Sequence, residues 1–380
     1  MNALQTSATR HAPDSATGAR AFEAPPLPLA PARWDWGGVR RVLVVRLRSI
    51  GDTALSTPSL YALRRFLPDA QIDLLLEDWV APLLDGNPDA SRILTVRRDS
   101  MTSRLALVRR LRAAHYDVAF NLHGGSTAAL LTRASGARRR VGYASYRFSR
   151  LHNYAAPPAT DLWRQAKTHS VEQQLGLLGW TGVPVTDRPP TRLFVTDEAA
   201  ARVARRLDAA GIGASQPFAL FHPAAAFDSK RWDARNFARV ADYLDARGFA
   251  VVAVAAPGET DVVGAFAESA QKARVVSFND LSLPEVTALA ARARLFVGND
   301  SGIAHIAAAV RTPSVVVFGS SNVAHWRPWT DAPAEVVREE MPCAPCAGYT
   351  CGEFAEAQCI RRVSVERVNA AVERVLHTVS

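Results

Sequence analysis

Arg41-Val-Leu-Val-Val-Arg-Leu-Arg-Ser-Ile-Gly-Asp-Thr53 is the stretch that decides the fold class of this 380-residue chain. Residues 41–47 form a short apolar run, which is typical of a strand buried in a parallel sheet. Residues 48–52 read as a loop, and the pattern from about 53 to 66 is helical. A strand that leads through a short loop into a helix indicates an α/β fold.

The same alternation runs through the rest of the chain in two series. The first series predicts strands at 71–77, 92–96, 117–122 and 141–143, and helices at 79–84, 103–114 and 127–134. The second predicts strands at 218–222, 250–255, 275–278, 295–297 and 314–318, and helices at 196–210, 234–247, 261–271, 284–293, 302–310 and 365–377. We therefore predict two Rossmann-like domains, each a doubly wound parallel sheet. They face a central cleft, where ligands of such sheets bind.

The boundaries follow from composition. We expect a disordered leader at 1–37, an N-terminal domain at 38–182, a linker at 183–190, a C-terminal domain at 191–362 and a C-terminal helix at 363–380. The leader is rich in Pro, Ala and Ser and lacks both helical periodicity and the apolar segment of a signal peptide. No apolar run approaches the roughly 18–20 residues that span a bilayer, so we expect a cytoplasmic protein.

Charge is the next informative feature. The chain is 48% hydrophobic and 21% charged, as in globular proteins, with a net charge of +9. Ten arginines and only one acidic residue, Asp117, lie between Ser103 and Arg150. Such a stretch attracts anions, namely anionic lipid or a phosphorylated acceptor, although a basic solvated surface would have the same composition. No recognition helix or stacking aromatic motif accompanies the charge, which argues against nucleic acid.

Asp52 is the first candidate for chemistry. It follows the strand end at 47, where a carboxylate facing the cleft could take a proton from a sugar hydroxyl. Gly51 beside it permits a tight turn with close backbone approach to a ligand. The alternative is structural, because Asp at or near a helix N-cap stabilises the helix by about 1 kcal/mol.

Three loops in the second half carry further candidates. The first runs from His222 to Trp232, and its Lys230-Arg231 pair suits a departing diphosphate, although a solvated turn fits equally. The second is Gly298-Asn-Asp-Ser-Gly-Ile-Ala-His305, which places backbone donors at a helix N-terminus with a histidine one turn later. The third, Ala256-Pro-Gly-Glu259, ends a strand with an acid that could bind ribose hydroxyls.

These motifs, in this order, resemble glycosyltransferase family 9, the ADP-heptose:lipopolysaccharide heptosyltransferases. The resemblance runs from about Arg41 to the C-terminus. It rests on Arg46-Leu-Arg-Ser-Ile-Gly-Asp-Thr-Ala-Leu-Ser-Thr-Pro58, Lys230-Arg-Trp232, Val297-Gly-Asn-Asp-Ser-Gly-Ile-Ala-His305 and Phe318-Gly-Ser320 followed by Trp326 and Pro328. It implies the GT-B fold and transfer of heptose from ADP-heptose to an anionic Kdo-lipid A or core acceptor. It also implies peripheral contact with the cytoplasmic face of the inner membrane.

The resemblance also implies residue roles. Asp52 would be the general base of an inverting transfer that needs no metal. The donor diphosphate would be bound by Lys230, Asp300, Ser301, Gly302 and His305, the nucleotide by Glu259 and His222, and the acceptor by Gly51, Arg48 and His123. The loop after His222 departs from the family pattern, because Ala224, Ala225 and Ala226 replace hydroxyl or amide side chains.

Three alternatives stay open from the sequence. The chain could be a GT-B transferase with another nucleotide-sugar donor, or one with a protein acceptor, as in autotransporter heptosyltransferases. It could also be a non-catalytic sugar-nucleotide-binding protein of envelope assembly, although a base and a cation at the cleft argue against this. A dinucleotide-dependent oxidoreductase would need Gly-x-Gly-x-x-Gly after a strand, which the sequence lacks.

The four cysteines form a separate cluster. Cys343, Cys346, Cys351 and Cys359 are the only cysteines of the chain. Clustered thiols in a cytoplasmic protein suggest a structural zinc or iron site, but only the first pair has common ligand spacing. Free or redox-labile thiols are the alternative.

Overall fold

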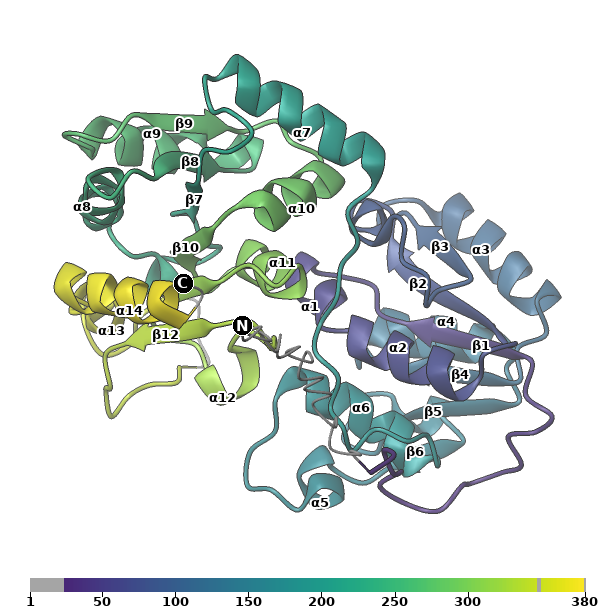
Figure 1. The fold of residues 1–380 in the computed structure, drawn as a ribbon. Helices are drawn as coiled ribbons and strands as arrows, with labels where there is room; N and C mark the ends of the chain where they lie inside the picture. Colours follow the sequence, from purple (N-terminus) through teal and green to yellow (C-terminus); the bar gives the residue numbers. More distant parts are fainter. Residues whose placement is uncertain (1–23, 347–349, 379–380) are drawn as a thin grey trace, which may run out of the picture.

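The computed structural model describes residues 24–346 and 350–378, which form two six-stranded sheets (Figure 1). Residues 1–23 of the predicted leader and the last two residues of the chain lie outside the described residues. The first sheet has the order β3 (Arg92–Val96), β2 (Gln71–Glu77), β1 (Arg41–Val45), β4 (Val118–Asn121), β5 (Arg139–Tyr143), β6 (Tyr154–Ala156). The second has the order β12 (Ala334–Arg338), β11 (Ser314–Phe318), β10 (Leu295–Asn299), β7 (Phe218–His222), β8 (Ala250–Val254), β9 (Val275–Phe278). Every strand pair in both sheets is parallel.

Helices cover both faces of the first sheet. The two sets are α3 (Met101–Ala113) with α4 (Ser126–Ala134), and α2 (Thr57–Phe66) with α6 (Ser170–Trp180); α1 (Ile50–Ala54), α5 (Ala159–Trp163) and the 3-10 turns η1 (Ala81–Leu84) and η2 (Ser149–Leu151) complete the domain. Alternate residues of β1 point to opposite faces: Leu43 and Val45 pack under α3 and α4, whereas Val42 and Val44 pack under α2 and α6. This double covering explains why the strands read as continuous apolar runs.

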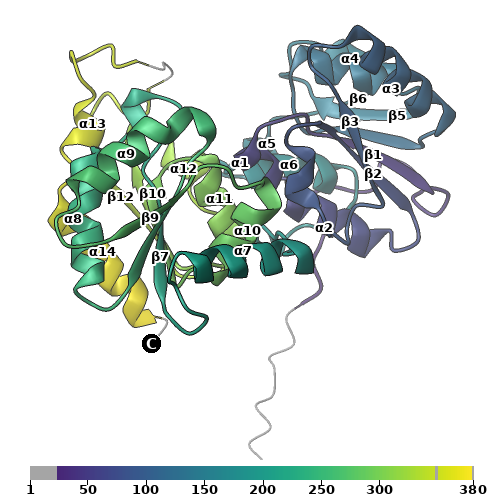
Figure 2. The ribbon, with the colours of Figure 1, turned by 90° about the horizontal axis from the view of Figure 1, so that it is seen from above.

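The second sheet is covered in the same way. Its helices are α7 (Asp197–Ala209), α8 (Ala234–Asp245), α9 (Thr260–Ser269), α10 (Leu283–Arg292), α11 (Gly302–Ala309), α12 (Val323–Trp326), α13 (Gln358–Arg361) and α14 (Val365–Thr378), with turns η3 (Asp228–Lys230) and η4 (Pro257–Glu259). The C-terminal helix α14 packs against α8, β11 and β12 of its own domain. One buried apolar cluster runs from the α2–α6 face of the first sheet to the α10–α11 face of the second. Figure 2 shows α10 and α11 on the side of the second sheet that faces the first.

The register of the central strands positions the candidate site. Val45, the last residue of β1, is paired with Asn121, the last residue of β4, and with Leu75, two residues before the end of β2. In the second sheet, Gly298 of β10 is paired with His222 of β7. The loops at 46–49, 122–125, 223–230 and 299–301 therefore begin at the carboxyl edges of the two sheets, as ligand-binding loops do in this fold class.

The structure departs from the predicted elements at identifiable points. The helix expected at 53–66 is two helices, because Pro58 has no N–H to continue the first one and begins a new first turn instead. The helix expected at 79–84 is only the 3-10 turn η1. Strands β6 and β12 and helix α6 were not predicted. Each is short or nearly uniformly buried, so it lacks the periodicity that reveals an element.

Residues 24–37, which the sequence analysis placed in a disordered leader, are packed against the first domain. The Trp36 side chain is buried, and its Nε1 donates a hydrogen bond to the carbonyl of Thr181 at 2.9 Å. The Leu29 N–H donates to Gly179 O at 3.0 Å, and Trp36 packs edge-on against Phe66. The segment is irregular but packed, because its large apolar side chains cover the end of α6. None of the helices in the described parts of the chain is long and apolar enough to cross a membrane.

Candidate active site

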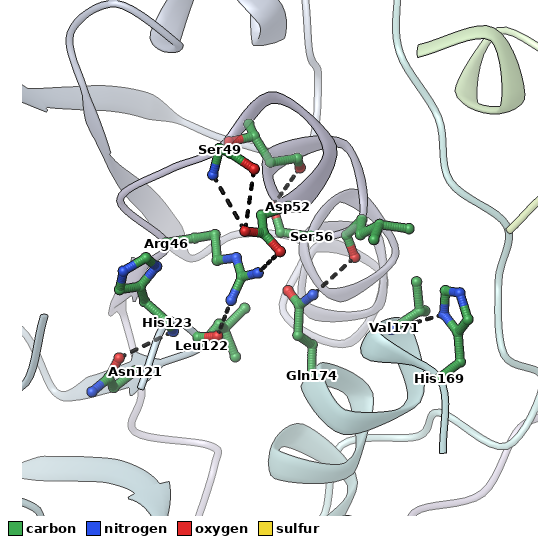
Figure 3. Close-up of polar contacts among 12 residues, drawn as sticks. Arg46, Ser49, Asp52, Ser56, Asn121, Leu122, His123, His169, Val171 and Gln174 are labelled. Carbon is green, nitrogen blue, oxygen red and sulfur yellow. Dashed lines mark hydrogen bonds and ion pairs between the residues drawn. The ribbon is translucent and has the colours of Figure 1, made fainter. Parts of the chain in front are cut away.

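Asp52 lies in the first turn of α1, at the carboxyl end of β1 (Figure 3). The helix begins after the N-cap residue Ser49, so Asp52 is its third residue and lies near the N-cap, as the sequence suggested, in a capping box with Ser49. One carboxylate oxygen of Asp52 pairs with the Arg46 guanidinium. The other accepts from the Ser49 N–H at 3.4 Å and from Ser49 Oγ at 3.3 Å. The side chain keeps 23% of its surface exposed, so the carboxylate is partly accessible to an incoming ligand.

Arg46 is a site residue to which the sequence analysis gave no role. It is buried, and it also donates to the carbonyl of Leu122 at 2.5 Å, which fixes the guanidinium under α1. His123 follows Leu122 at the end of β4, and its N–H donates to Asn121 Oδ1 at 3.1 Å. Burial and the charge of Arg46 lower the pKa of His123 to about 4, so its ring is neutral at pH 7. An arginine directly after a buried strand is the sequence signal that could have identified Arg46.

Helices α1 and α11 carry the two domains into direct contact. A Cβ added to Gly51 would lie 2.7 Å from Cδ2 of His305, so only glycine allows this approach. A Cβ added to Gly302 would likewise lie 2.8 Å from Cβ of Ile50. Gly51 is buried within α1 and does not lie in a turn that approaches a ligand, as was predicted. The need for space beside His305 explains why this position is glycine. Gly302 packs on α1 in this arrangement.

His305 links the two halves of the site electrostatically. Its side chain is buried, and burial lowers its pKa, whereas the charges of Asp300 and Asp52 act in the opposite direction. Lys230 adds a further lowering contribution. The ring therefore lies within the electrostatic reach of the base in one domain and of the Lys230–Asp300 pair in the other. Its Nδ1 is buried without a hydrogen-bond partner among the described residues.

Lys230 and Asp300 form an ion pair with Nζ and Oδ2 2.8 Å apart. The Asp300 carboxylate also accepts from the hydroxyl of Ser321, and its own N–H donates to Val317 O. In this structure Asp300 therefore holds Lys230, and its predicted place at the donor diphosphate stays a prediction. The Lys230 ammonium has three donors and keeps two of them beyond this contact.

His222 joins the remaining predicted residues. Its Nδ1 lies 3.1 Å from the Ser301 hydroxyl and its Nε2 lies 3.4 Å from Glu259 Oε2. Glu259 also accepts from the Ala256 N–H at 2.9 Å, and the contact with His222 lowers the pKa of the Glu259 carboxyl despite its partial burial. His222 is buried with both ring nitrogens engaged, so it orients Glu259 and Ser301.

Two other residues lie near this group. Arg48, a predicted acceptor residue, is exposed, and its charge contributes to the lowered pKa of His123. His325, which the sequence analysis missed, hydrogen-bonds Thr168 O through Nδ1 at 3.1 Å. Burial lowers the pKa of His325, and the charge of Asp52 opposes that lowering, so this histidine of the second domain also lies within the electrostatic reach of Asp52.

The four cysteines lie together in the second domain. All four line one cavity of about 10 Å³, with Ser229 and Ser320 at its wall. Burial raises the pKa of the Cys346 and Cys359 thiols, which disfavours the thiolate form that binds metals. Within 24–346 and 350–378 no group of three or more His, Cys, Asp or Glu side chains is arranged to hold a metal ion. The zinc or iron site stays a prediction.

Comparison with known proteins identifies the family. Residues 104–355 match the model of glycosyltransferase family 9 (heptosyltransferase). The chain is 32% identical over 302 residues to lipopolysaccharide heptosyltransferase 3 of Escherichia coli, covering 75% of this chain and 85% of that protein.

Solved structures agree on the fold. A family 9 glycosyltransferase from Veillonella parvula DSM 2008 superposes with a TM-score of 0.79 at 23% identity, over 92% of this chain and 99% of that one. The ADP-heptose lps heptosyltransferase II of E. coli superposes with a TM-score of 0.74 at 22% identity, over 89% and 99%. The predicted GT-B architecture of two doubly wound parallel sheets is confirmed. The chain belongs to glycosyltransferase family 9, the heptosyltransferases, and is a glycosyltransferase.

Proposed function

We propose that this enzyme transfers a heptose from ADP-heptose to an inner-core acceptor of lipopolysaccharide, with inversion at the anomeric carbon. The names of the relatives support the donor and the acceptor class. The observation that supports the mechanism is that His305, whose helix α11 packs on α1, feels the charge of Asp52 from one domain and the charges of Lys230 and Asp300 from the other. A base on one side and a cation on the other are the two groups that a single displacement needs.

In the proposed step, the Asp52 oxygen that contacts Ser49 takes the proton of an acceptor hydroxyl. The hydroxyl oxygen attacks the anomeric carbon from the face opposite the diphosphate, and the bond from that carbon to the β-phosphate oxygen breaks with its electron pair. ADP leaves, and Lys230 balances its charge together with the Ser301 hydroxyl and nearby backbone N–H groups. In this proposal the positive charge comes from Lys230 and no metal is required.

Arg46 and His222 act through other residues. Arg46 holds one Asp52 oxygen, which leaves the other to face the acceptor. His222 holds Glu259, whose second oxygen is then directed to a ribose hydroxyl of ADP. We further propose that neutral His123 hydrogen-bonds the acceptor, and that the enzyme works peripherally at the cytoplasmic face of the inner membrane, where Kdo-lipid A is presented.

The test is ADP release from ADP-heptose with Kdo-lipid A or heptosylated core as acceptor. Asp52→Asn keeps the shape of the side chain and removes the base, so acceptor-dependent release should fall by about 10²-fold or more while ADP still binds. The matched control is Asp208→Asn, which makes the same chemical change at an exposed position of α7, outside the site. It should leave acceptor-dependent release unchanged.

Other outcomes would redirect the assignment. Turnover with a protein acceptor or with another nucleotide sugar would replace the acceptor or donor and keep the base. Binding of ADP-heptose without turnover on any acceptor would support a non-catalytic envelope protein. Full activity of Asp52→Asn would refute the proposed base.

A further inference from the structure

The arginines between 103 and 150 lack acidic partners. Among the described residues none of these ten forms an ion pair with a carboxylate. After residue 200, by contrast, eleven arginines pair with Asp or Glu. The positive charge of the second domain is therefore largely neutralised internally, whereas that of 103–150 is left for an external anion.

Five of these arginines lie on one side of the first domain. Arg109 and Arg112 are exposed on α3, Arg133 is exposed on α4, and Arg147 and Arg150 are exposed in the turn after β5. Helices α3 and α4 pack side by side, and η2 packs against α4 (Figure 2). We call this surface the α3–α4 face; it comprises the outer sides of α3 and α4 and the turn 144–151.

The same face exposes large apolar side chains. Met101 and Leu105 of α3 are 65% and 59% exposed, Leu130 of α4 is 57% exposed and Phe148 is 38% exposed. Met101, Leu105 and Arg109 are spaced four residues apart, so they lie along one outward stripe of α3, whereas its buried residues lie on the opposite side. A helix on a purely water-facing surface carries polar residues on that stripe.

We propose that the α3–α4 face docks on a bilayer rich in anionic phospholipid. Arginines that have no internal carboxylate partner bind the lipid phosphates, and the aliphatic side chains between them enter the headgroup region. A nucleic acid would use the arginines but would offer nothing to Met101, Leu105 and Leu130. Only the choice of membrane rests on the proposed function; the lipid affinity itself does not.

The face is also placed to bring the acceptor to Asp52. Helix α3 follows β3 and α4 follows β4, so both helices begin at the carboxyl edge of the sheet, where α1 and Asp52 lie. Met101 and Leu105 lie in the first turns of α3, near that edge, whereas Arg109, Arg112 and Arg133 lie in the later turns of α3 and α4, toward the opposite edge. In a docked enzyme, Met101 and Leu105 therefore enter the headgroup region on the side of the domain that carries the base.

The test measures binding to vesicles that contain no glycosyl acceptor. Full-length protein is sedimented with vesicles of phosphatidylcholine alone or mixed with phosphatidylglycerol. Each basic side chain near an anionic surface contributes about fivefold, so Arg109→Glu/Arg112→Glu/Arg133→Glu should weaken binding by at least roughly 100-fold. Leu105→Gln/Leu130→Gln should weaken it by about 10-fold at the same net charge, because the apolar contribution is lost.

The matched control reverses three exposed arginines of the second domain, Arg205→Glu/Arg274→Glu/Arg362→Glu, with the same change in net charge. It should bind nearly as the parent does. Equal weakening by both triple variants would reduce the effect to net charge and overturn the docking face, as would equal binding to both kinds of vesicle. An ADP-binding titration shows that each variant is folded, and since no acceptor is present, failure here leaves the transferase assignment intact.

Discussion

Gly51 offers a sharp test of how the two domains meet, through the substitution Gly51→Ala. The new Cβ would lie 2.7 Å from Cδ2 of His305, about 1 Å closer than the roughly 3.5–4.0 Å of a normal carbon contact. Overpacking of this kind costs about 1–3 kcal/mol, whereas Ala in place of Gly in a helix gains about 0.5–1 kcal/mol. We expect a net loss of stability of up to about 2 kcal/mol.

A second variant separates the clash from the helix effect. In a His305→Ala background the ring is gone, so Gly51→Ala should be neutral or stabilising, and the two substitutions should couple by about 1–3 kcal/mol. Gly264→Ala is the control for helix propensity, because it lies in α9 and its Cβ would meet nothing within 4 Å. Differential scanning calorimetry of the parent, both single variants, the double variant and this control measures the shifts.

Activity supplies an independent readout of the same perturbation. Because Gly51 precedes Asp52, a displacement of about 1 Å at α1 should lower acceptor-dependent ADP release by up to about 10²-fold. The deciding comparison is between the Tm change that Gly51→Ala causes in the parent and the change that it causes in the His305→Ala background. If Gly51→Ala lowers Tm equally with and without the His305 ring, the contact between α1 and α11 is not what requires glycine.

Three further results are expected. Lys230→Met should lower Tm, since it leaves the buried Asp300 carboxylate unpaired, and adding Asp300→Asn should restore Tm without restoring ADP release. His222 lowers the pKa of Glu259, so this carboxyl stabilises the fold above its ordinary pKa and the gain is lost as pH falls through the lowered value; urea titrations of Glu259→Gln should show a weaker acid dependence. Burial lowers the pKa of His169 from 6.5 to about 3, so stability should fall as pH drops through that window, and His169→Gln should flatten that part of the same titration.

Most strands and helices could be predicted from the sequence because the patterns that specify them lie within short stretches of the chain. Buried strands such as 218–222 and 314–318 are short apolar runs, and their helices follow within a few residues. The carboxyl ends of parallel strands must share an edge, so Asp52, Lys230 and Asp300 could be assigned to those edges without a structure. Residues 24–37 were mispredicted because their order comes from contacts with α6, far away in the chain.

By itself, the sequence determined the two alternating series, the loops at the strand ends and the family motifs, since periodicity and turn chemistry act between near neighbours. Only the tertiary structure decided which of those residues meet: Arg46 with Asp52, Lys230 with Asp300, His222 with Glu259 and Ser301. It also showed that Gly51 makes room for His305 of the other domain. Such pairs join positions on different elements, and their distances depend on how sheets and helices pack, which no local pattern encodes.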